Sequence, residues 1–175
     1  MEELLRELEQ FQKSHFYMFN ISRKTGEFLE KLVKEHKPKN ILEIGTSNGY
    51  STIWLAVAGD EVGAAVTTIE TEQEKIDLAK ENFKKAGLKN IKIIKGPALE
   101  ILPKLKQRFD FVFLDAVKSE YIDYLKLLLP KLKKPAIVTA HNIISAREKL
   151  KDYLEFVKKF KTKTYKEFDL EVTIF

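Results

Sequence analysis

The residues best suited to chemistry lie in a short loop after the first apolar strand. Residues 41–51 read ILEIGTSNGYS, so a buried strand runs into a turn bounded by Gly45 and Gly49 and then into a helix. Glycine lets the backbone approach a ligand closely, and a helix N-terminus offers unpaired N–H groups to a carboxylate or phosphate. The loop therefore predicts a site for a small charged ligand. Its GxxxG spacing matches neither the dinucleotide fingerprint nor the phosphate loop, which disfavours NAD and ATP.

Two acids near this loop extend the prediction. Glu70 ends the next apolar strand about 20 residues after Gly49, where an acid accepts hydrogen bonds from ribose hydroxyls in related folds. A nucleoside ligand is therefore expected, although the glycines could simply make a tight turn and Glu70 could simply cap a helix. Glu43 lies within the first strand, where a lone buried carboxylate is costly. We expect it to point to the mouth of the strand and meet a cationic ligand group.

These side chains need a frame of alternating strands and helices. Apolar spacing predicts two helices before residue 38, and then an alternation that is typical of parallel βαβ units. The expected strands cover 41–44, 65–69, 91–94, 109–114 and 136–139, and the expected helices cover 51–58, 72–86, 98–105, 121–129 and 146–160.

The C-terminal part differs, because two β-rich pieces, 162–168 and 170–175, follow each other almost without a connector. Strands joined so tightly must pair antiparallel. The prediction is an α/β, Rossmann-like, doubly wound sheet of seven mostly parallel strands with an antiparallel C-terminal hairpin and helices on both faces. We expect one domain over 1–175, with N-terminal helices over 1–37 and the Rossmann-like core over 38–175.

Composition narrows the class of protein. Hydrophobic residues make up 44% and charged residues 33%, which excludes collagen-like and disordered chains. Cysteine is absent, so disulfides, thiolate metal sites and cysteine nucleophiles are excluded, and a cytoplasmic location is expected. No apolar run approaches the ~20 residues that span a bilayer, so no membrane association is expected. The net charge of +5 permits a polyanion partner, and the enrichment in Lys and Glu is typical of a thermophile.

Four motifs carry a resemblance to a known family. They are EIGTSNGYS at 43–51, Glu70, GPALEIL at 96–102 and FDFVFLDAVKSEYIDYL at 109–125. With them the chain resembles class I S-adenosylmethionine-dependent methyltransferases. More narrowly, it is similar to the cation-dependent O-methyltransferase family that includes catechol and caffeoyl-CoA O-methyltransferases. The resemblance implies S-adenosyl-L-methionine as cofactor and methyl transfer to a hydroxyl oxygen of a small-molecule acceptor.

The resemblance also implies contacts for each part of the cofactor. The methionine portion would lie against Gly45, Ser47 and Gly49, its carboxylate against Ser51, and its amino group near Glu43. Glu70 would bind the ribose. The adenine ring would be bordered by Ala98, Leu99, Ala116 and Val117, with Asp115 nearby. Ile21 and Ser22 would form part of a lid over the cofactor.

The catalytic end of the site departs from the family pattern. Asp115 matches a metal-ligand aspartate, and Lys118 matches a lysine that accepts the acceptor's proton. His141 stands where the family has a second aspartate, beside a retained Asn142. The implied divalent metal site is therefore Asp115, His141 and Asn142. Because imidazole replaces a carboxylate, affinity for Mg²⁺ or Ca²⁺ should fall relative to Mn²⁺, Co²⁺ or Zn²⁺.

Three interpretations of His141 remain open: a ligand for a softer metal, a general base in a metal-free enzyme, or a structural histidine. Two further functions also remain open. The excess of basic over acidic residues and the segments KLKQR and KPKN favour a tRNA or other RNA methyltransferase. The altered metal ligands favour a non-catalytic cofactor-binding subunit. The apolar N-terminal helices and the FYMF cluster at 16–19 suggest a homodimer, although this cluster could instead cover the edge of the active site.

Overall fold

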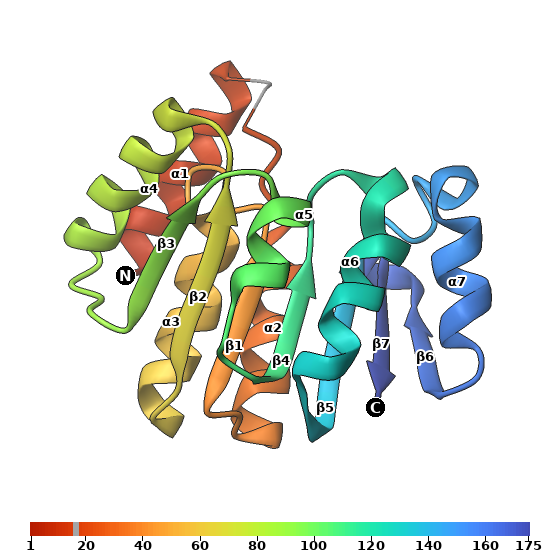
Figure 1. Cartoon of the computed structure of the whole chain (residues 1–175). Helices are drawn as coiled ribbons and strands as arrows, with labels where there is room; N and C mark the ends of the chain where they lie inside the picture. Colours follow the sequence, from red (N-terminus) through yellow and green to blue (C-terminus); the bar gives the residue numbers. More distant parts are fainter. Residues whose placement is uncertain (16–17) are drawn as a thin grey trace.

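Seven strands form one sheet in the order β3-β2-β1-β4-β5-β7-β6 (Figure 1). The structure is a computed structural model that describes residues 1–15 and 18–175. The strands are β1 (Asn40–Ile44), β2 (Ala65–Glu70), β3 (Ile91–Lys95), β4 (Phe109–Leu114), β5 (Leu132–His141), β6 (Lys161–Tyr165) and β7 (Leu170–Ile174). The first five are parallel, while β7 runs antiparallel to both β5 and β6. The predicted mostly parallel sheet with an antiparallel hairpin is confirmed.

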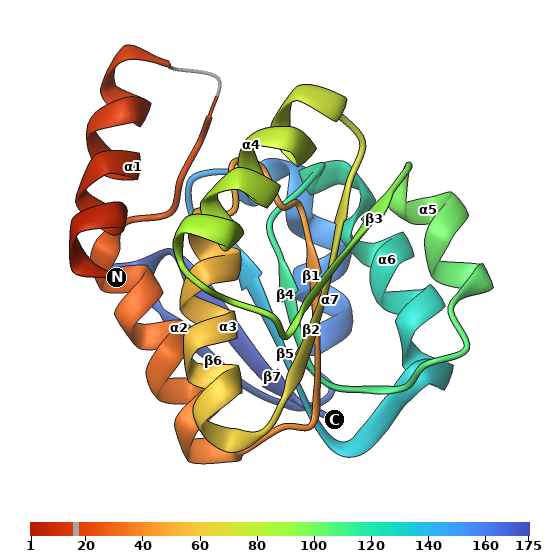
Figure 2. The same ribbon diagram turned by 90° about the vertical axis from the view of Figure 1, so that its left-hand side faces the viewer.

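Helices cover both faces of the sheet, as the sequence predicts. They are α1 (Glu2–Ser14), α2 (Arg23–His36), α3 (Tyr50–Val62), α4 (Gln73–Lys85), α5 (Ala98–Ile101), α6 (Tyr121–Leu128) and α7 (Lys151–Val157). One apolar cluster packs α1 to α4 on one face, and a second packs α5 to α7 on the other (Figure 2). The central strands β1 and β4 are nearly continuous apolar runs because both of their faces are covered. Within the described residues, no helix is long and apolar enough to cross a membrane.

Strand register brings the chemically interesting residues to one edge of the sheet. Ile44 at the end of β1 pairs with Ile69 of β2 and with Leu114 of β4. The Gly45 N–H donates to the carbonyl of Ile69 at 3.0 Å, and the Asp115 N–H donates to the carbonyl of Ile44 at 2.9 Å. The loops that follow β1, β2 and β4 therefore start at the same level.

Two predicted helices are shorter than expected. The segment 98–105 gives α5 and then a 3₁₀ turn over Leu102–Lys104, which contains Pro103 and so lacks a backbone donor there. The predicted helix 146–160 becomes a 3₁₀ turn over Arg147–Leu150 followed by α7. The reason lies upstream, because the backbone of the preceding loop is bound to the β6–β7 hairpin instead of to a helical turn.

The N-terminal helix α1 packs its apolar face against other parts of the same chain. Leu4, Leu5 and Leu8 are buried in the cluster that also contains α2 and α3. Of the FYMF cluster, residues 16 and 17 lie outside the described residues, Met18 is buried and Phe19 is 77% exposed. The three buried leucines of α1 are therefore not free to contact a second copy.

Candidate active site

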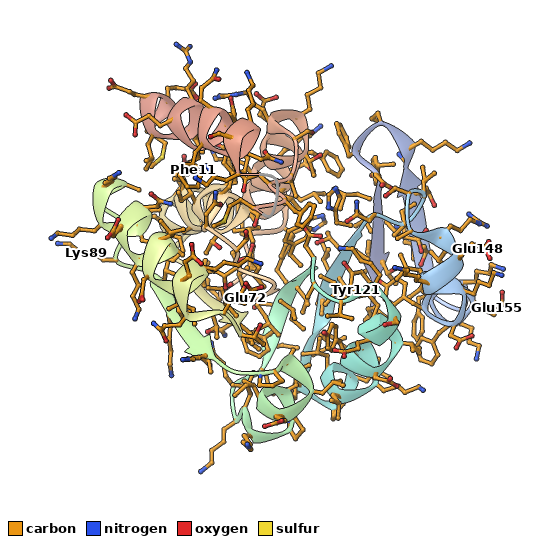
Figure 3. All side chains as sticks on the ribbon, turned by 90° about the horizontal axis from the view of Figure 1, so that it is seen from above. Phe11, Glu72, Lys89, Tyr121, Glu148 and Glu155 are labelled. Carbon is orange, nitrogen blue, oxygen red and sulfur yellow. The ribbon has the colours of Figure 1, made fainter. Side chains whose placement is uncertain are left out.

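A pocket of about 630 Å³ opens at the carboxyl ends of β1, β2 and β4. Its size lies within the range of small-molecule sites in proteins. Figure 3 looks onto this end of the molecule and shows Glu72, a lining residue, near the middle. Most of the predicted site residues line the pocket: Ile21, Gly45, Ser47, Ser51, Glu70, Ala98, Asp115, Ala116, Lys118, His141 and Asn142. Glu43, Gly49 and Leu99 do not line it.

The two loop glycines serve different purposes. Gly45 has φ +101°, and a Cβ there would lie 2.2 Å from the carbonyl oxygen of Asp115, so the loops after β1 and β4 can touch only because this residue is glycine. Gly49 has φ +88° and is the N-cap residue of α3, but a Cβ there would meet the ring of Phe83 at 2.5 Å. The side of Gly49 where a side chain would stand thus faces α4. The sequence had predicted that Gly49 lies against the ligand.

Glu70 both shapes the loop and faces the pocket. One of its oxygens, Oε2, accepts the Ser47 N–H at 2.9 Å, and the other accepts the N–H groups of Thr71 at 2.7 Å and Glu72 at 3.1 Å. A carboxylate offers about four acceptor positions over its two oxygens. Since Oε2 receives a single bond from the described residues, it retains an acceptor position for a ligand hydroxyl.

Glu43 lies under the loop and not at its mouth. Its carboxylate is fully buried and accepts hydrogen bonds from the hydroxyls of Ser51 at 2.6 Å, Thr68 at 2.7 Å and Thr52. Burial raises the pKa of Glu43 to about 7, and the hydroxyls offset part of that effect. Glu43 therefore does not face the pocket, and the predicted contact between Glu43 and a ligand ammonium is not supported by this arrangement. The hydroxyl-rich pairs Ser51-Thr52 and Thr67-Thr68 were the signal for a satisfied buried acid.

The start of α3 completes the polar end of the pocket. Asn48 accepts the Tyr50 N–H at 3.2 Å with its side-chain oxygen, while its amide nitrogen is buried and has no hydrogen-bond partner among the described residues. The Tyr50 hydroxyl donates to Glu9 of α1 at 2.5 Å, which ties α1 to the pocket wall. The helix N-terminus and the unpaired amide both suit an anionic ligand group. The pocket therefore fits a nucleoside that carries a carboxylate.

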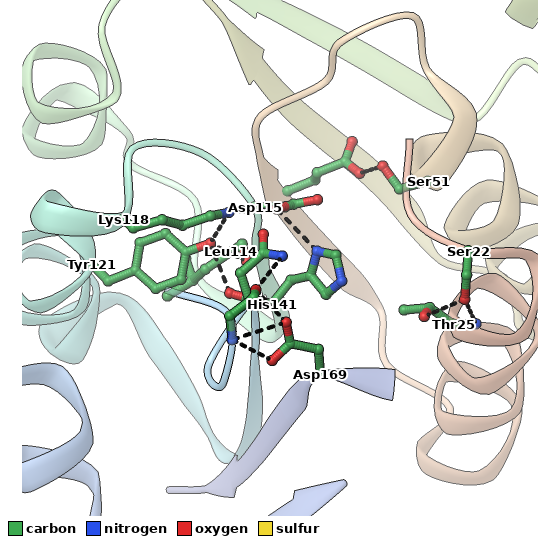
Figure 4. A network of polar contacts seen from close by, with 12 residues as sticks. Ser22, Thr25, Ser51, Leu114, Asp115, Lys118, Tyr121, His141 and Asp169 are labelled. Atoms are coloured by element: carbon green, nitrogen blue, oxygen red, sulfur yellow. Dashed lines mark hydrogen bonds and ion pairs between the residues drawn. The ribbon is translucent and has the colours of Figure 1, made fainter. Parts of the chain in front are cut away.

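Ile21 and Ser22, expected in a lid, are placed differently from each other. Ile21 is buried and lines the pocket. Ser22 instead caps α2, and its hydroxyl accepts the Thr25 N–H at 3.1 Å (Figure 4). Phe19 and Asn20 also line the pocket, so that residues 19–21 form one of its walls. Phe19 belongs to the cluster that could cover the edge of the site, whereas Asn20 was not predicted.

The catalytic end brings together an acid, a lysine and a histidine (Figure 4). Asp115 Oδ1 lies 2.6 Å from Lys118 Nζ and 3.2 Å from His141 Nδ1, and the acid is only 13% exposed. Burial would raise the pKa of Asp115, but the neighbouring imidazole and ammonium outweigh it, so that the pKa is lowered. Lys118 Nζ also donates to the Tyr121 hydroxyl at 2.9 Å, which donates in turn to the carbonyl of Leu114 at 2.8 Å. Tyr121 is another residue that was not predicted from the sequence.

The donor set does not suit a hard divalent cation such as Mg²⁺ or Ca²⁺. Asp115 is the one acid of the predicted ligand set, and its Oδ1 is already shared by an ammonium and an imidazole. The Asn142 amide group donates to Ser145 Oγ at 3.1 Å. Across the described ranges 1–15 and 18–175, no three His, Asp or Glu side chains gather around a common point. Hard cations prefer about six or more oxygen ligands, which these residues do not provide.

Comparisons with known proteins agree with the resemblance. The chain is 36% identical over 130 residues to a catechol O-methyltransferase of Niastella koreensis, covering 71% of this chain and 58% of the relative. It is 34% identical over 126 residues to a catechol O-methyltransferase of Mycobacterium tuberculosis, covering 71% and 57%. The chain thus spans somewhat more than half the length of these relatives.

Solved structures share the fold and match most of both chains. A putative caffeoyl-CoA O-methyltransferase from Staphylococcus aureus has a TM-score of 0.85 at 27% identity, covering 97% of this chain and 91% of that one. An O-methyltransferase from Bacillus cereus in complex with SAH has a TM-score of 0.83 at 25% identity, covering 99% and 91%. The O-methyltransferase family model matches residues 1–169. The chain therefore belongs to the O-methyltransferase family.

Proposed function

We propose that this chain is an S-adenosylmethionine-dependent O-methyltransferase that acts on a hydroxyl group of a small molecule. The observation that carries the proposal is that one pocket is lined by the carboxylate of Glu70, by Asn48 next to the N-terminus of α3, and by the Lys118–Asp115–His141 group. Relatives named as catechol O-methyltransferases support the small-molecule acceptor.

Each part of the pocket has a task in this function. When bound, S-adenosylmethionine supplies a methyl group on a positively charged sulfur. Glu70 binds the ribose, the first turn of α3 with Ser51 holds the carboxylate, and Ala98 and Ala116 border the adenine. Holding the acceptor oxygen in line with the methyl group is the main contribution to the rate. A group at the Lys118 end of the pocket must also take the proton of the acceptor hydroxyl.

Calorimetry of the purified protein with S-adenosylmethionine tests the first half of the proposal, and mass spectrometry after incubation with a panel of catechols tests the second. Binding together with a gain of one methyl group on a catechol supports it. Methylation of undermodified tRNA alone would favour the RNA alternative. Tight binding without transfer to either class would favour the non-catalytic subunit, and absence of binding would overturn the whole proposal.

Further expectations from the sequence stay predictions: a single domain, a homodimer, a cytoplasmic location and an origin in a hot environment. Phe19 at the pocket mouth is the one strongly exposed aromatic side chain in the described residues, and it supports a contact with a second copy. Light scattering of wild type and Phe19→Ser tests the dimer. A wild-type monomer would contradict it.

A further inference from the structure

The orientation of His141 fixes which of its ring nitrogens carries a proton. Nδ1 lies 3.2 Å from Asp115 Oδ1, close enough for an ion pair but without the geometry of a hydrogen bond. Two acceptors would repel each other at this distance, so neutral His141 must carry its proton on Nδ1. The lone pair is then on Nε2. Catalytic hydrogen bonds are commonly misaligned until the substrates bind.

The other ring nitrogen is free to act on a ligand. No described residue forms a hydrogen bond with Nε2, and His141 lines the pocket with 14% of its side chain exposed. Unlike the imidazole of a structural histidine, this ring is held by a carboxylate on one side and has an unused acceptor on the other. The same arrangement of acid and imidazole makes a histidine an effective base in unrelated enzymes.

Lys118 lies between two polar partners. Its Nζ donates to Asp115 and to Tyr121, and an ammonium has three donors, so one remains for a ligand in the pocket that Lys118 lines. Without this charge Asp115 would be a largely buried acid whose remaining partner is a neutral ring. Lys118 therefore supplies a positive charge directly beside Asp115.

We propose that His141 is the general base of the methyl transfer, oriented by Asp115, and that the Lys118 ammonium binds the acceptor oxygen in place of a divalent cation. This inference rests on the proposed function. Lys118 and His141 are then catalytic residues, and Asp115 is a positioning residue for His141.

The step balances without any further reactant. The bond between the methyl carbon and sulfur breaks with its electron pair staying on sulfur, which becomes neutral. The bond between that carbon and the acceptor oxygen forms. The hydroxyl proton goes to His141 Nε2, and the resulting imidazolium is stabilised by Asp115.

Variants of the two residues separate their roles. His141→Ala should lower kcat by about 10²- to 10⁴-fold, with the affinity for S-adenosylmethionine within about twofold, and added imidazole should restore part of the rate. Lys118→Arg keeps a cation that cannot act as a base and should retain most of the rate, while Lys118→Met should lose it. His36→Ala, at the exposed end of α2, is the matched control and should behave as wild type.

Two measurements do not depend on turnover. Nitrogen NMR of the wild type should find neutral His141 protonated on Nδ1. Electron paramagnetic resonance with Mn²⁺ should find no bound ion. In the activity assay, which does depend on turnover, EDTA should leave the rate unchanged. A His141→Ala rate within about threefold of wild type, an Nε2-protonated ring, or stoichiometric Mn²⁺ binding with loss of activity in EDTA would each overturn the inference. Failure of the wild type to methylate any acceptor would be visible separately, as failure of the proposed function itself.

Discussion

The carboxylate of Asp169, in the turn between β6 and β7, accepts the main-chain N–H of Ile144 at 2.6 Å. Its other oxygen accepts the hydroxyl of Ser145, and its carbonyl accepts the Ile143 N–H at 3.3 Å. Ser145 in turn binds the side chain of Asn142. The C-terminal hairpin thus holds the loop that follows His141, although Asp169 itself does not line the pocket.

Replacing Asp169 by Ala should loosen this loop. Loss of the exposed hydrogen bonds should cost about 1 kcal/mol of stability. Because small displacements of a catalytic group are costly, kcat should fall by about 10- to 100-fold while the affinity for S-adenosylmethionine stays the same. Steady-state kinetics and calorimetry check this, with Glu167→Ala in the same turn as control. A parallel loss of cofactor affinity would mean that the hairpin supports the whole pocket and not the His141 loop.

Replacing Glu70 by Ala should weaken S-adenosylmethionine by about 1 to 3 kcal/mol, because the ribose hydroxyls lose a charged acceptor and the Ser47 N–H loses its partner. Calorimetry measures the change directly. Glu81→Ala on the exposed side of α4 provides the comparison and should bind normally. An unchanged dissociation constant for Glu70→Ala would remove this residue from the ribose site.

Replacing Gly45 by Ala should destabilise the protein by several kcal/mol or leave it unfolded, since the new Cβ would lie 2.2 Å from backbone in a region of φ that favours glycine. Gly87→Ala is a matched control, because Gly87 also has positive φ (+69°) but a Cβ there would have no atom within 4 Å. It should cost about 1 kcal/mol. Urea denaturation of both variants separates the free-energy cost of the steric clash from the cost of the positive φ alone. Equal losses of unfolding free energy would contradict the close approach of the loops after β1 and β4.

The pKa of Glu43 makes stability depend on pH. Its carboxyl binds a proton up to about pH 7 in the folded state but only up to its ordinary pKa of 4.5 when unfolded. Between these values the folded state holds more protons, so the free energy of unfolding should fall as pH rises from 4.5 to 7, by about 3 kcal/mol. Glu43→Gln should flatten this dependence. Urea denaturation at pH 5 and pH 8 tests it, and the same slope in both proteins would show that Glu43 is ionised throughout.

Much of this architecture could be predicted from local patterns. The alternation of apolar strands with amphipathic segments is a short-range property, and so is the tight join between β6 and β7. The order of the strands across the sheet is not a short-range property. Nothing near residue 170 indicates that β7 would pair with β5 and leave β6 at the edge. The same holds for the contact between Asp169 and Ile144, which are 25 positions apart.

Site residues were predicted correctly where the local sequence alone determines their position in the fold. Glu70 and Asp115 end parallel strands and therefore reach the same edge. Glu43 was misplaced because three hydroxyls from two other elements satisfy its carboxylate. Gly49 was misplaced because its bare side faces Phe83, a residue of a later helix. Both errors concern contacts that spacing along the chain does not encode.

The position of β7 has a consequence for how the protein is made. Strand β6 joins the sheet only through β7, and β7 also supplies the outer partner of β5. During translation, the ribosome must therefore release residues up to 174 before the His141 loop acquires its anchor. A nascent chain halted after β5 would already contain the pocket-lining residues up to His141. It would still lack the hairpin that holds the loop after His141 in place.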